Sequence, residues 1–449
     1  MLSIQALHEA YRRRALSPVE VTQQVLADAE AWEPHLNAIV TLMPEEAMAQ
    51  ARAAEQAFAR GEDRGPLQGV PISVKDLFET NGVRTTAGSP ILTDWIPNRD
   101  ATIVTRLRQA GAVLFAKANM LEFAYGVVHP DFGHTRNPWD LTRSTSGSSS
   151  GSAALVAAGV GAASIGSDTG GSIRLPAAWC GITGLKATYG RVSRAGAVPL
   201  SWSLDHVGPL TRTPADAAAV LQAIAGSDPA DPTTCDQPAP DDYLGALSRP
   251  LTGLRVGVLR QAWAPCGQET QAKVDEAVRS LGHQLVEVDV PCWPDVGGAY
   301  HAIVSPEAAA FHERWLRERP GDYSEAARTR LELGLLQPAV DLVRAQRFRR
   351  RLCAELDAGL RQADVLALPT AANPAVKIAD AGGPRPLTTT TGAFNLAGLP
   401  AISTPCGFSA EGLPIGLQLA ARAWDEATLL AVANAYVRAG GSTWPSIPT

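Results

Sequence analysis

The sequence predicts an α/β fold built as one large domain. From about residue 70 to the C-terminus, short apolar runs typical of buried strands alternate with amphipathic segments typical of helices. Of the 449 residues, 45% are hydrophobic, which is enough for a large core, and no segment repeats another. Length alone would allow two or three domains. The alternation favours a single domain over residues 1–449, with an N-terminal helical segment over 1–60.

The first 60 residues carry helix signals only. Ser17 is a predicted N-cap, Pro18 occupies the first helical position and Glu20 completes a capping box. An alanine-rich helix is predicted over residues 44–60 and ends at Gly61. We therefore expect helical packing throughout this segment.

The sheet is predicted to begin at residue 70. An apolar strand at 70–74, an amphipathic helix at 102–111 and a buried strand at 112–116 indicate a right-handed parallel crossover. Residues 119–140 are irregular but rich in large apolar side chains, which is typical of a loop that lines a pocket.

The remaining elements follow from the same patterns. A helix with Thr213 as its N-cap is predicted at 214–226, and residues 184–190 and 204–209 are predicted as turns between short strands. Further strands are predicted at 254–259, 284–290, 365–369, 401–405 and 413–421, and further helices at 270–281, within the mostly helical segment 299–363, and at 426–438.

Composition excludes several classes of protein. The net charge of −6 lacks the basic footprint of a nucleic-acid-binding protein, and the one basic run, residues 344–351, fits a solvated helix face. No apolar run reaches the ~18 residues of a membrane span, and the N-terminus lacks a secretory signal pattern. The six cysteines form no metal-binding or Cys-x-x-Cys spacing. We expect a cytoplasmic protein with reduced thiols, no metal and no cofactor, as a monomer or homodimer.

The most unusual stretch is residues 144–180, which is rich in serine and glycine. Such composition is typical of a linker, but a linker would not carry the apolar segment at 153–165. We expect this apolar segment to lie in a folded interior, with a turn at residues 169–172.

Serines in such turns can be nucleophiles if a base takes their proton. No histidine lies in a Gly-x-Ser-x-Gly elbow, and His206 fits a structural role better than a catalytic one. Lys75 follows the strand at 70–74, and a buried lysine can act as a base because burial lowers its pKa. Its spacing alone favours an ordinary exposed lysine at a strand end.

The motifs taken together closely resemble the amidase signature family. The resemblance rests on GVPISVKD at 69–76, GSSSGSAA at 147–154, GSDTGGSIR at 166–174, CGITGLK at 180–186 and NLAGLPA at 395–401. It covers nearly the whole chain and is weakest across residues 230–365. It implies a large, mixed, mostly parallel sheet covered on both faces by helices, with a catalytic core at 70–225 and a variable, helical substrate-side segment at 300–363.

The resemblance implies that residues 147–151 and 168–172 form two active-site turns joined by a buried helix, and it also implies a mechanism. Ser172 would be the nucleophile, Ser148, preceded by a cis peptide bond, would relay the proton, and Lys75 would be the base. The backbone N–H groups of residues 169–172 would form the oxyanion hole, which includes Thr169, Gly170 and Gly171. Ser149 would support Lys75, while Asp168 and Arg174 would hold the turn.

The sequence departs from the family pattern at three positions. Ser146 and Ser150 stand where the family usually has glycine, and Ala187 stands where it usually has proline. Lys75, Ser148 and Ser172 are all present, so we interpret the departures as packing changes.

The substrate pocket is expected to be apolar and partly aromatic. Its predicted residues are Met120, Ala124, Tyr125, Gly126, Val127 and Trp202. Such a pocket favours small-molecule aryl or alkyl amides, with carbamates (urethanes) or esters as further substrates. The alternative is the glutaminase subunit of a tRNA-dependent amidotransferase, from whose usual sequence the loop at 125–130 and residues 200–202 differ. The intact catalytic positions disfavour a non-catalytic binding protein.

Overall fold

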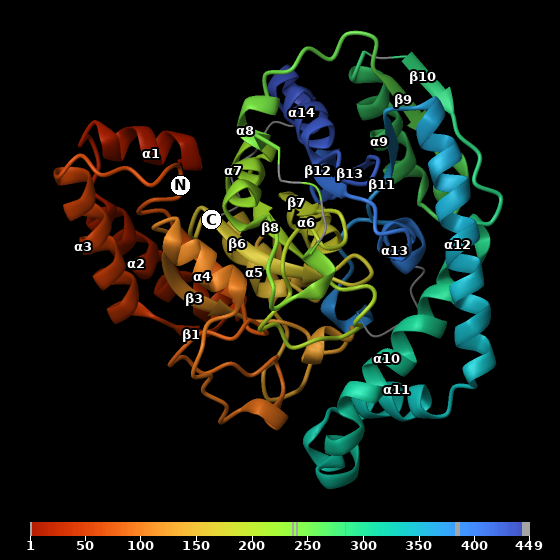
Figure 1. Cartoon of the computed structure of the whole chain (residues 1–449), viewed down its shortest axis with the longest axis horizontal. Helices are drawn as coiled ribbons and strands as arrows, with labels where there is room; N and C mark the ends of the chain where they lie inside the picture. Colours follow the sequence, from red (N-terminus) through yellow and green to blue (C-terminus); the bar gives the residue numbers. More distant parts are fainter. Residues whose placement is uncertain (1, 236–237, 239–240, 283, 382–386, 442–449) are drawn as a thin grey trace.

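The predicted strands join into one central sheet, shown in Figure 1 in a computed structural model that describes residues 2–235, 238, 241–282, 284–381 and 387–441. Their order across the sheet is β1-β3-β2-β6-β8-β7-β12-β13-β11-β9-β10. These strands are β1 (Ile39–Leu42), β2 (Pro71–Lys75), β3 (Val113–Ala118), β6 (Ala163–Asp168), β7 (Thr183–Lys186), β8 (His206–Thr211), β9 (Arg255–Val258), β10 (Gln284–Glu287), β11 (Val365–Pro369), β12 (Ala401–Phe408) and β13 (Pro414–Ala420). A separate pair, β4 (Arg136–Asn137) and β5 (Asp140–Ser144), lies within the irregular loop region.

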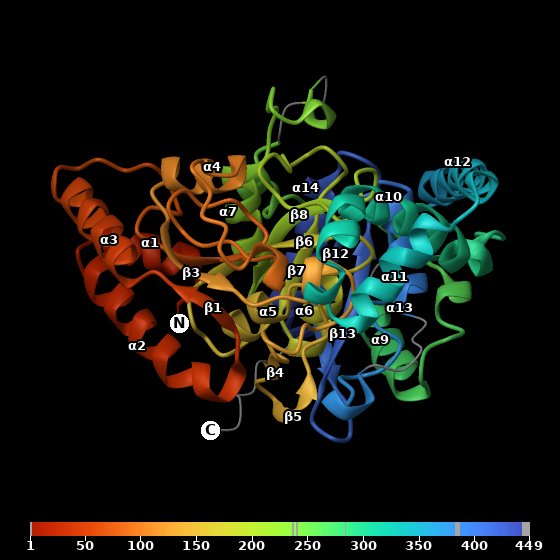
Figure 2. The ribbon, with the colours of Figure 1, turned by 90° about the horizontal axis from the view of Figure 1, so that it is seen from below.

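Helices cover both faces of this sheet. They are α1 (Ile4–Arg12), α2 (Pro18–Leu36), α3 (Pro44–Ala59), α4 (Thr102–Gln109), α5 (Ser150–Ala157), α6 (Arg174–Cys180), α7 (Pro214–Ile224), α8 (Tyr243–Ala246), α9 (Gln268–Ser280), α10 (Val296–Glu318), α11 (Glu325–Leu335), α12 (Ala339–Gln362), α13 (Leu387–Leu396) and α14 (Glu426–Tyr436). Figure 2 shows α7 and α14 on one side of the central strands and α5 and α6 on the other.

The sheet is mixed, as expected, but the expectation of mostly parallel strands is wrong. Among the described residues, six of the ten neighbouring strand pairs are antiparallel. A parallel pair needs a long crossover, whereas a short connection gives an antiparallel pair. The connection between β12 and β13 is short, and the two strands are antiparallel, with Ala401 opposite Ala420 at one end and Phe408 opposite Pro414 at the other.

The N-terminal segment is helical with one exception. Ser17 caps α2, its hydroxyl accepting hydrogen bonds from the N–H groups of Val19 at 3.0 Å and Glu20 at 3.4 Å. Between α2 and α3, however, β1 pairs antiparallel with β3 and forms one edge of the sheet. The expectation of helices alone over residues 1–60 is therefore wrong, because a four-residue strand leaves little periodic signal.

The predicted crossover at the start of the sheet is confirmed, since β2 and β3 are parallel and α4 connects them. The apolar segment at 153–165 is not one buried helix. It consists of the end of α5 and the start of β6, separated by Gly159 and Gly161, which both have positive φ. Residues 184–190 and 204–209, predicted as turns, contribute to β7 and β8.

The segment over residues 299–363 is helical, as predicted. Helices α10, α11 and α12 form an arm that lies to one side of the sheet in Figure 1. In the described ranges of the chain, no helix combines the length and apolar character that a membrane crossing requires.

At two positions of the serine-rich turn, Gly147 and Gly151, the surrounding atoms leave no room for a side chain. A Cβ at Gly151 would lie 2.6 Å from the Asn119 backbone nitrogen and would also collide with the carbonyl oxygen of Ala38. A Cβ at Gly147 would lie 2.6 Å from Cγ of the Leu121 side chain. Ser150, by contrast, has room for its side chain and donates a hydrogen bond to the Asn119 carbonyl at 3.3 Å.

We predict that Gly151→Ala lowers the free energy of unfolding by ~1–3 kcal/mol, because the added methyl group meets backbone atoms that cannot rotate away. Ser150→Ala, at the adjacent position, should change it by less than ~1 kcal/mol. Urea unfolding of both variants measures the difference, and equal stabilities would contradict the packing argument.

Candidate active site

Lys75 lies at the end of β2 and is fully buried. Its Nζ donates hydrogen bonds to Ser148 Oγ at 2.6 Å and to Ser167 Oγ at 2.9 Å. The strand pairs with β3 on one side and β6 on the other, so the backbone that carries the lysine is held on both edges. The exposed-lysine interpretation is therefore wrong.

Burial lowers the pKa of Lys75 to about 7, because removal from water disfavours the charged ammonium. The carboxylates of Asp168 and Asp205 act in the opposite direction and raise this pKa. An amine with a pKa near 7 is neutral part of the time at neutral pH, so it can accept a proton.

Ser148 and Ser172 come from two turns that lie against each other. The N–H of Ser149 donates a hydrogen bond to the Ser172 carbonyl at 3.2 Å and so connects the two turns. The peptide bond between Gly147 and Ser148 is cis, as the family resemblance implies. Ser148 is 1% exposed, so its hydroxyl contacts Lys75 away from bulk water.

Ser167 was not predicted, although it contacts Lys75 directly. It stands near the end of β6, which is parallel to β2, so both side chains emerge at the same end of the sheet. The expected support of Lys75 by Ser149 is indirect: Ser149 Oγ donates to the Ser167 carbonyl at 3.2 Å. The parallel pairing of the two strands was the signal that could have identified Ser167.

Asp168 and Arg174 hold the second turn, and both are fully buried. Arg174 donates through Nε to Asp168 Oδ2 at 3.0 Å and through Nη2 to Oδ1 at 2.9 Å, which is a bidentate pair. Burial acts to raise the pKa of Asp168, but the Arg174 guanidinium outweighs it and holds this pKa well below its usual range.

The same carboxylate changes the expected oxyanion hole. The N–H of Gly171 donates to Asp168 Oδ1 at 2.7 Å, so it already has an acceptor within the protein. Gly171 has a φ of +134°, which turns its N–H toward the aspartate and suits glycine alone. The expectation that Gly171 donates to a substrate oxygen is thus not supported by this geometry, and Thr169, Gly170 and Ser172 are the remaining candidates.

Arg174 is also anchored to the C-terminal third of the chain. It donates to Gln418 Oε1 at 2.7 Å on β13 and to Asn395 Oδ1 at 2.7 Å on α13. Asn395 Nδ2 in turn donates to the Asp168 carbonyl at 2.9 Å. Asn395 belongs to a motif noted in the sequence, but nothing in the sequence singled out Gln418.

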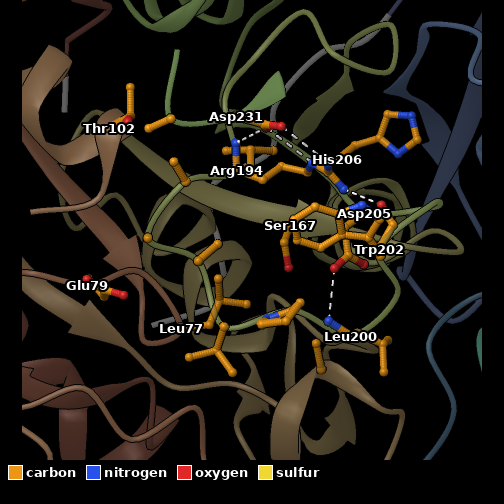
Figure 3. A pocket seen from close by; sticks show the side chains of 18 of the residues that line it. Leu77, Glu79, Thr102, Ser167, Arg194, Leu200, Trp202, Asp205, His206 and Asp231 are labelled. Carbon is orange, nitrogen blue, oxygen red and sulfur yellow. Dashed lines mark hydrogen bonds and ion pairs between the residues drawn. The ribbon is translucent and has the colours of Figure 1, made fainter. Parts of the chain in front are cut away.

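A cavity of about 590 Å³ opens beside these groups and is shown in Figure 3. Ser167 and Thr169 contribute to its wall. Of the predicted pocket residues, Ala124 and Trp202 line it, whereas Met120, Tyr125, Gly126 and Val127 do not. The Tyr125 hydroxyl instead donates to Ser305 Oγ at 3.1 Å, and Met120 is 1% exposed, within the core.

The cavity is less uniformly apolar than expected. Leu77, Leu200 and Phe311 form apolar parts of its wall. Charged side chains also line it. Arg99 contacts Glu79 at 2.6 Å and Arg194 contacts Asp231 at 3.4 Å, whereas Asp205 accepts its hydrogen bonds from a hydroxyl and two N–H groups. The wall therefore combines apolar surface with two ion pairs and the carboxylate of Asp205.

His206 is 3% exposed, and burial lowers its pKa well below the usual value, which fits the structural role expected for it. Within the residues that the structure describes, no group of three or more histidine, cysteine, aspartate or glutamate side chains could hold a metal ion.

Comparison with known proteins identifies the family. The family model described as Amidase matches residues 20–430. The chain belongs to the amidase signature family. The family hydrolyses carbon–nitrogen bonds, and this amidase is an enzyme of that class.

Three relatives illustrate the range of similarity. A glutamyl-tRNA(Gln) amidotransferase subunit from Roseiflexus sp. (strain RS-1) is 42% identical, over 97% of this chain and 96% of that protein. A solved structure from "an unexpected vestigial protein complex", which reveals the evolutionary origins of an s-triazine catabolic enzyme, is also similar. Its TM-score is 0.92 and its identity 37%, and the match covers 98% of this chain and 99% of that chain. Peptide amidase from Stenotrophomonas maltophilia has a TM-score of 0.87 and 32% identity, covering 100% and 99%.

We predict that kcat/KM of this amidase falls about tenfold per pH unit below the Lys75 pKa of about 7. The rate falls toward low pH because below this pKa the amine is protonated to an ammonium and cannot accept a further proton. Lys75→Ala should lower kcat/KM by orders of magnitude, with partial recovery at high pH, where hydroxide can replace the base. A pH–rate series on both proteins checks this. A mild loss with an unchanged profile would contradict it.

Proposed function

We propose that this amidase cleaves amide bonds through an acyl-enzyme on Ser172, with Ser148 as proton relay and Lys75 as base. The observation that supports this most directly is the 2.6 Å hydrogen bond between Lys75 Nζ and Ser148 Oγ inside a buried site. Among the described residues Lys75 makes no ion pair that would neutralise its charge, and it faces two hydroxyl groups instead.

The proposed first half-reaction forms an ester. Ser172 Oγ attacks the substrate carbonyl carbon and gives its proton to Ser148 Oγ, which passes its own proton to Lys75 Nζ. The carbonyl oxygen becomes an oxyanion and accepts hydrogen bonds from the N–H groups of Thr169 and Gly170. When the tetrahedral intermediate collapses, the carbon–nitrogen bond breaks and the proton returns through Ser148 to the leaving amine.

Water completes the reaction along the same route. It attacks the ester carbonyl and gives a proton through Ser148 to Lys75, and Ser172 leaves with that proton. The free acid is released and the neutral lysine is restored, so the cycle needs no cofactor.

The amidotransferase relative favours a specific substrate, the side-chain amide of glutamine. In that proposal the chain is the glutaminase subunit of a tRNA-dependent amidotransferase, which is supported by its 42% identity to one such amidotransferase chain over nearly the full length. It would then act in the cytoplasm as part of a complex, in place of the monomer or homodimer expected from the sequence.

The second candidate is a free-standing amidase for aryl or alkyl amides, with carbamates and esters as further substrates. The apolar part of the cavity wall, formed by Leu77, Leu200 and Phe311, supports it. So does the similarity to a peptide amidase over the whole chain.

We expect Ser172→Ala to lower turnover of any true amide substrate by at least about a thousandfold, because it removes the nucleophile. Ser152→Ala is the matched control: this buried hydroxyl makes no hydrogen bond within the described structure, so activity should stay near wild type. Steady-state rates on a chromogenic anilide and on glutamine measure both variants. Rates near wild type in Ser172→Ala on every substrate would refute the proposed nucleophile.

The two substrate proposals predict different results for the natively purified enzyme. A glutaminase subunit should co-purify with partner chains and release ammonia from glutamine far faster in that complex than alone. A free-standing amidase should cleave anilides or carbamates at the same rate with or without other chains. Intact-complex mass measurement and an ammonia assay on the same fractions decide between them.

A further inference from the structure

A tight turn over residues 200–205 is hydrogen-bonded on one side to helix α10 and on the other to the active-site turn at residues 168–172. The N–H of Asp205 donates to the Ser201 carbonyl at 3.0 Å, which closes the turn. Asp205 Oδ2 accepts hydrogen bonds from the N–H groups of Leu200 at 2.9 Å and Ser201 at 3.1 Å. One aspartate oxygen is therefore fully used to hold its own turn.

The other oxygen reaches the catalytic region. Thr169 Oγ1 donates to Asp205 Oδ1 at 2.6 Å. Thr169 is 1% exposed and directly follows Asp168, and its backbone N–H is one of the proposed oxyanion donors. The hydrogen bond from the Thr169 hydroxyl to Asp205 thus links the orientation of this N–H group to the position of the turn at 200–205.

Helix α10 holds the same turn from the opposite side. Glu307 Oε1 accepts from Ser203 Oγ at 2.7 Å, and Glu307 Oε2 accepts from the Ser203 N–H at 3.0 Å and from Ser201 Oγ. A continuous series of hydrogen bonds therefore runs from Glu307 through the turn and Asp205 to Thr169.

Asp205 also differs from Asp168 in its charge environment. Both carboxylates act on Lys75 and raise its pKa, but Asp168 is paired bidentately with Arg174. Asp205 accepts its hydrogen bonds from a hydroxyl and two N–H groups; burial raises its pKa, and these hydrogen bonds and the charge of Arg194 act in the opposite direction. Removal of the Asp205 charge should therefore lower the pKa of Lys75.

We propose that Asp205 is a positioning residue for amide hydrolysis, which orients the Thr169 N–H in the oxyanion hole and is itself held in place by Glu307 from helix α10. This proposal rests on the proposed function, in which Lys75 is the base and Thr169 an oxyanion donor. Oxyanion donors act on the charge that develops in the transition state, so misplacing one lowers kcat and leaves KM nearly unchanged.

The first test uses Thr169. Thr169→Val keeps the shape and the backbone N–H but removes the hydroxyl that Asp205 holds. We expect kcat to fall by about 10- to 100-fold with KM within about twofold, and Thr169→Ser to restore most of the loss. If Thr169→Val and Thr169→Ser have equal kcat, the hydroxyl does not orient the N–H and the proposal fails.

The second test separates the charge of Asp205 from its contacts. Asp205→Asn should lower kcat and also move the acidic limb of the kcat/KM profile to lower pH, because the lost negative charge makes Lys75 easier to deprotonate. Glu307→Gln should lower kcat less and leave the limb where it is. Asp216→Asn is the matched control, since Asp216 is also buried and accepts hydrogen bonds from the Ile4 N–H at 2.7 Å and the Thr213 hydroxyl at 2.8 Å, but does not line the cavity.

Rates are normalised to active sites titrated with a fluorophosphonate, so that loss of folded protein does not count as loss of kcat. Normalised rates and pH profiles of Asp205→Asn identical to those of Asp216→Asn would overturn the proposal. The proposed function is judged separately: Ser172→Ala inactive with normal Asp205 variants refutes only the positioning role, whereas active Ser172→Ala refutes the function itself.

Discussion

The buried ion pair between Asp168 and Arg174 is the interaction on which the site depends. Asp168 ends β6, Arg174 begins α6, and their bidentate contact closes the turn between them. Arg174 also binds side chains of α13 and β13, so segments more than 200 residues apart meet at one guanidinium. A buried charged pair is favourable only when its remaining donors and acceptors are satisfied, and here the chain supplies partners for them.

Lys75 is a second buried basic side chain, but its partners differ from those of Arg174. Arg174 is matched by a carboxylate, whereas Lys75 is matched by two hydroxyl groups, which cannot neutralise an ammonium. The fold therefore uses Arg174, in its ion pair with Asp168, as a structural anchor, whereas burial lowers the pKa of Lys75. Their environments differ although both side chains are fully buried within the same few segments.

Much of this could be predicted from the sequence, and the failures share a physical cause. Local signals identified the α2 cap at Ser17 and the crossover from β2 to β3, because caps and buried strands depend on neighbouring residues, whereas the two serine turns followed from the family resemblance. Ser167 and Gln418 were missed because their roles arise from strand neighbours distant in sequence. The direction of the strands was misjudged for the same reason. The hydrogen bond from the Gly171 N–H to Asp168 depends on backbone geometry, which residue types alone do not specify.

The two retained glycines of the serine turn place different limits on how the sequence can diverge. At Gly147 the obstacle is the movable end of the Leu121 side chain, so a smaller residue at 121 could compensate for a larger one at 147. At Gly151 the obstacle is backbone on two segments, the one before β1 and the one after β3. No single side-chain change elsewhere can relieve that collision. Positions 147 and 121 can therefore covary, whereas 151 is fixed on its own.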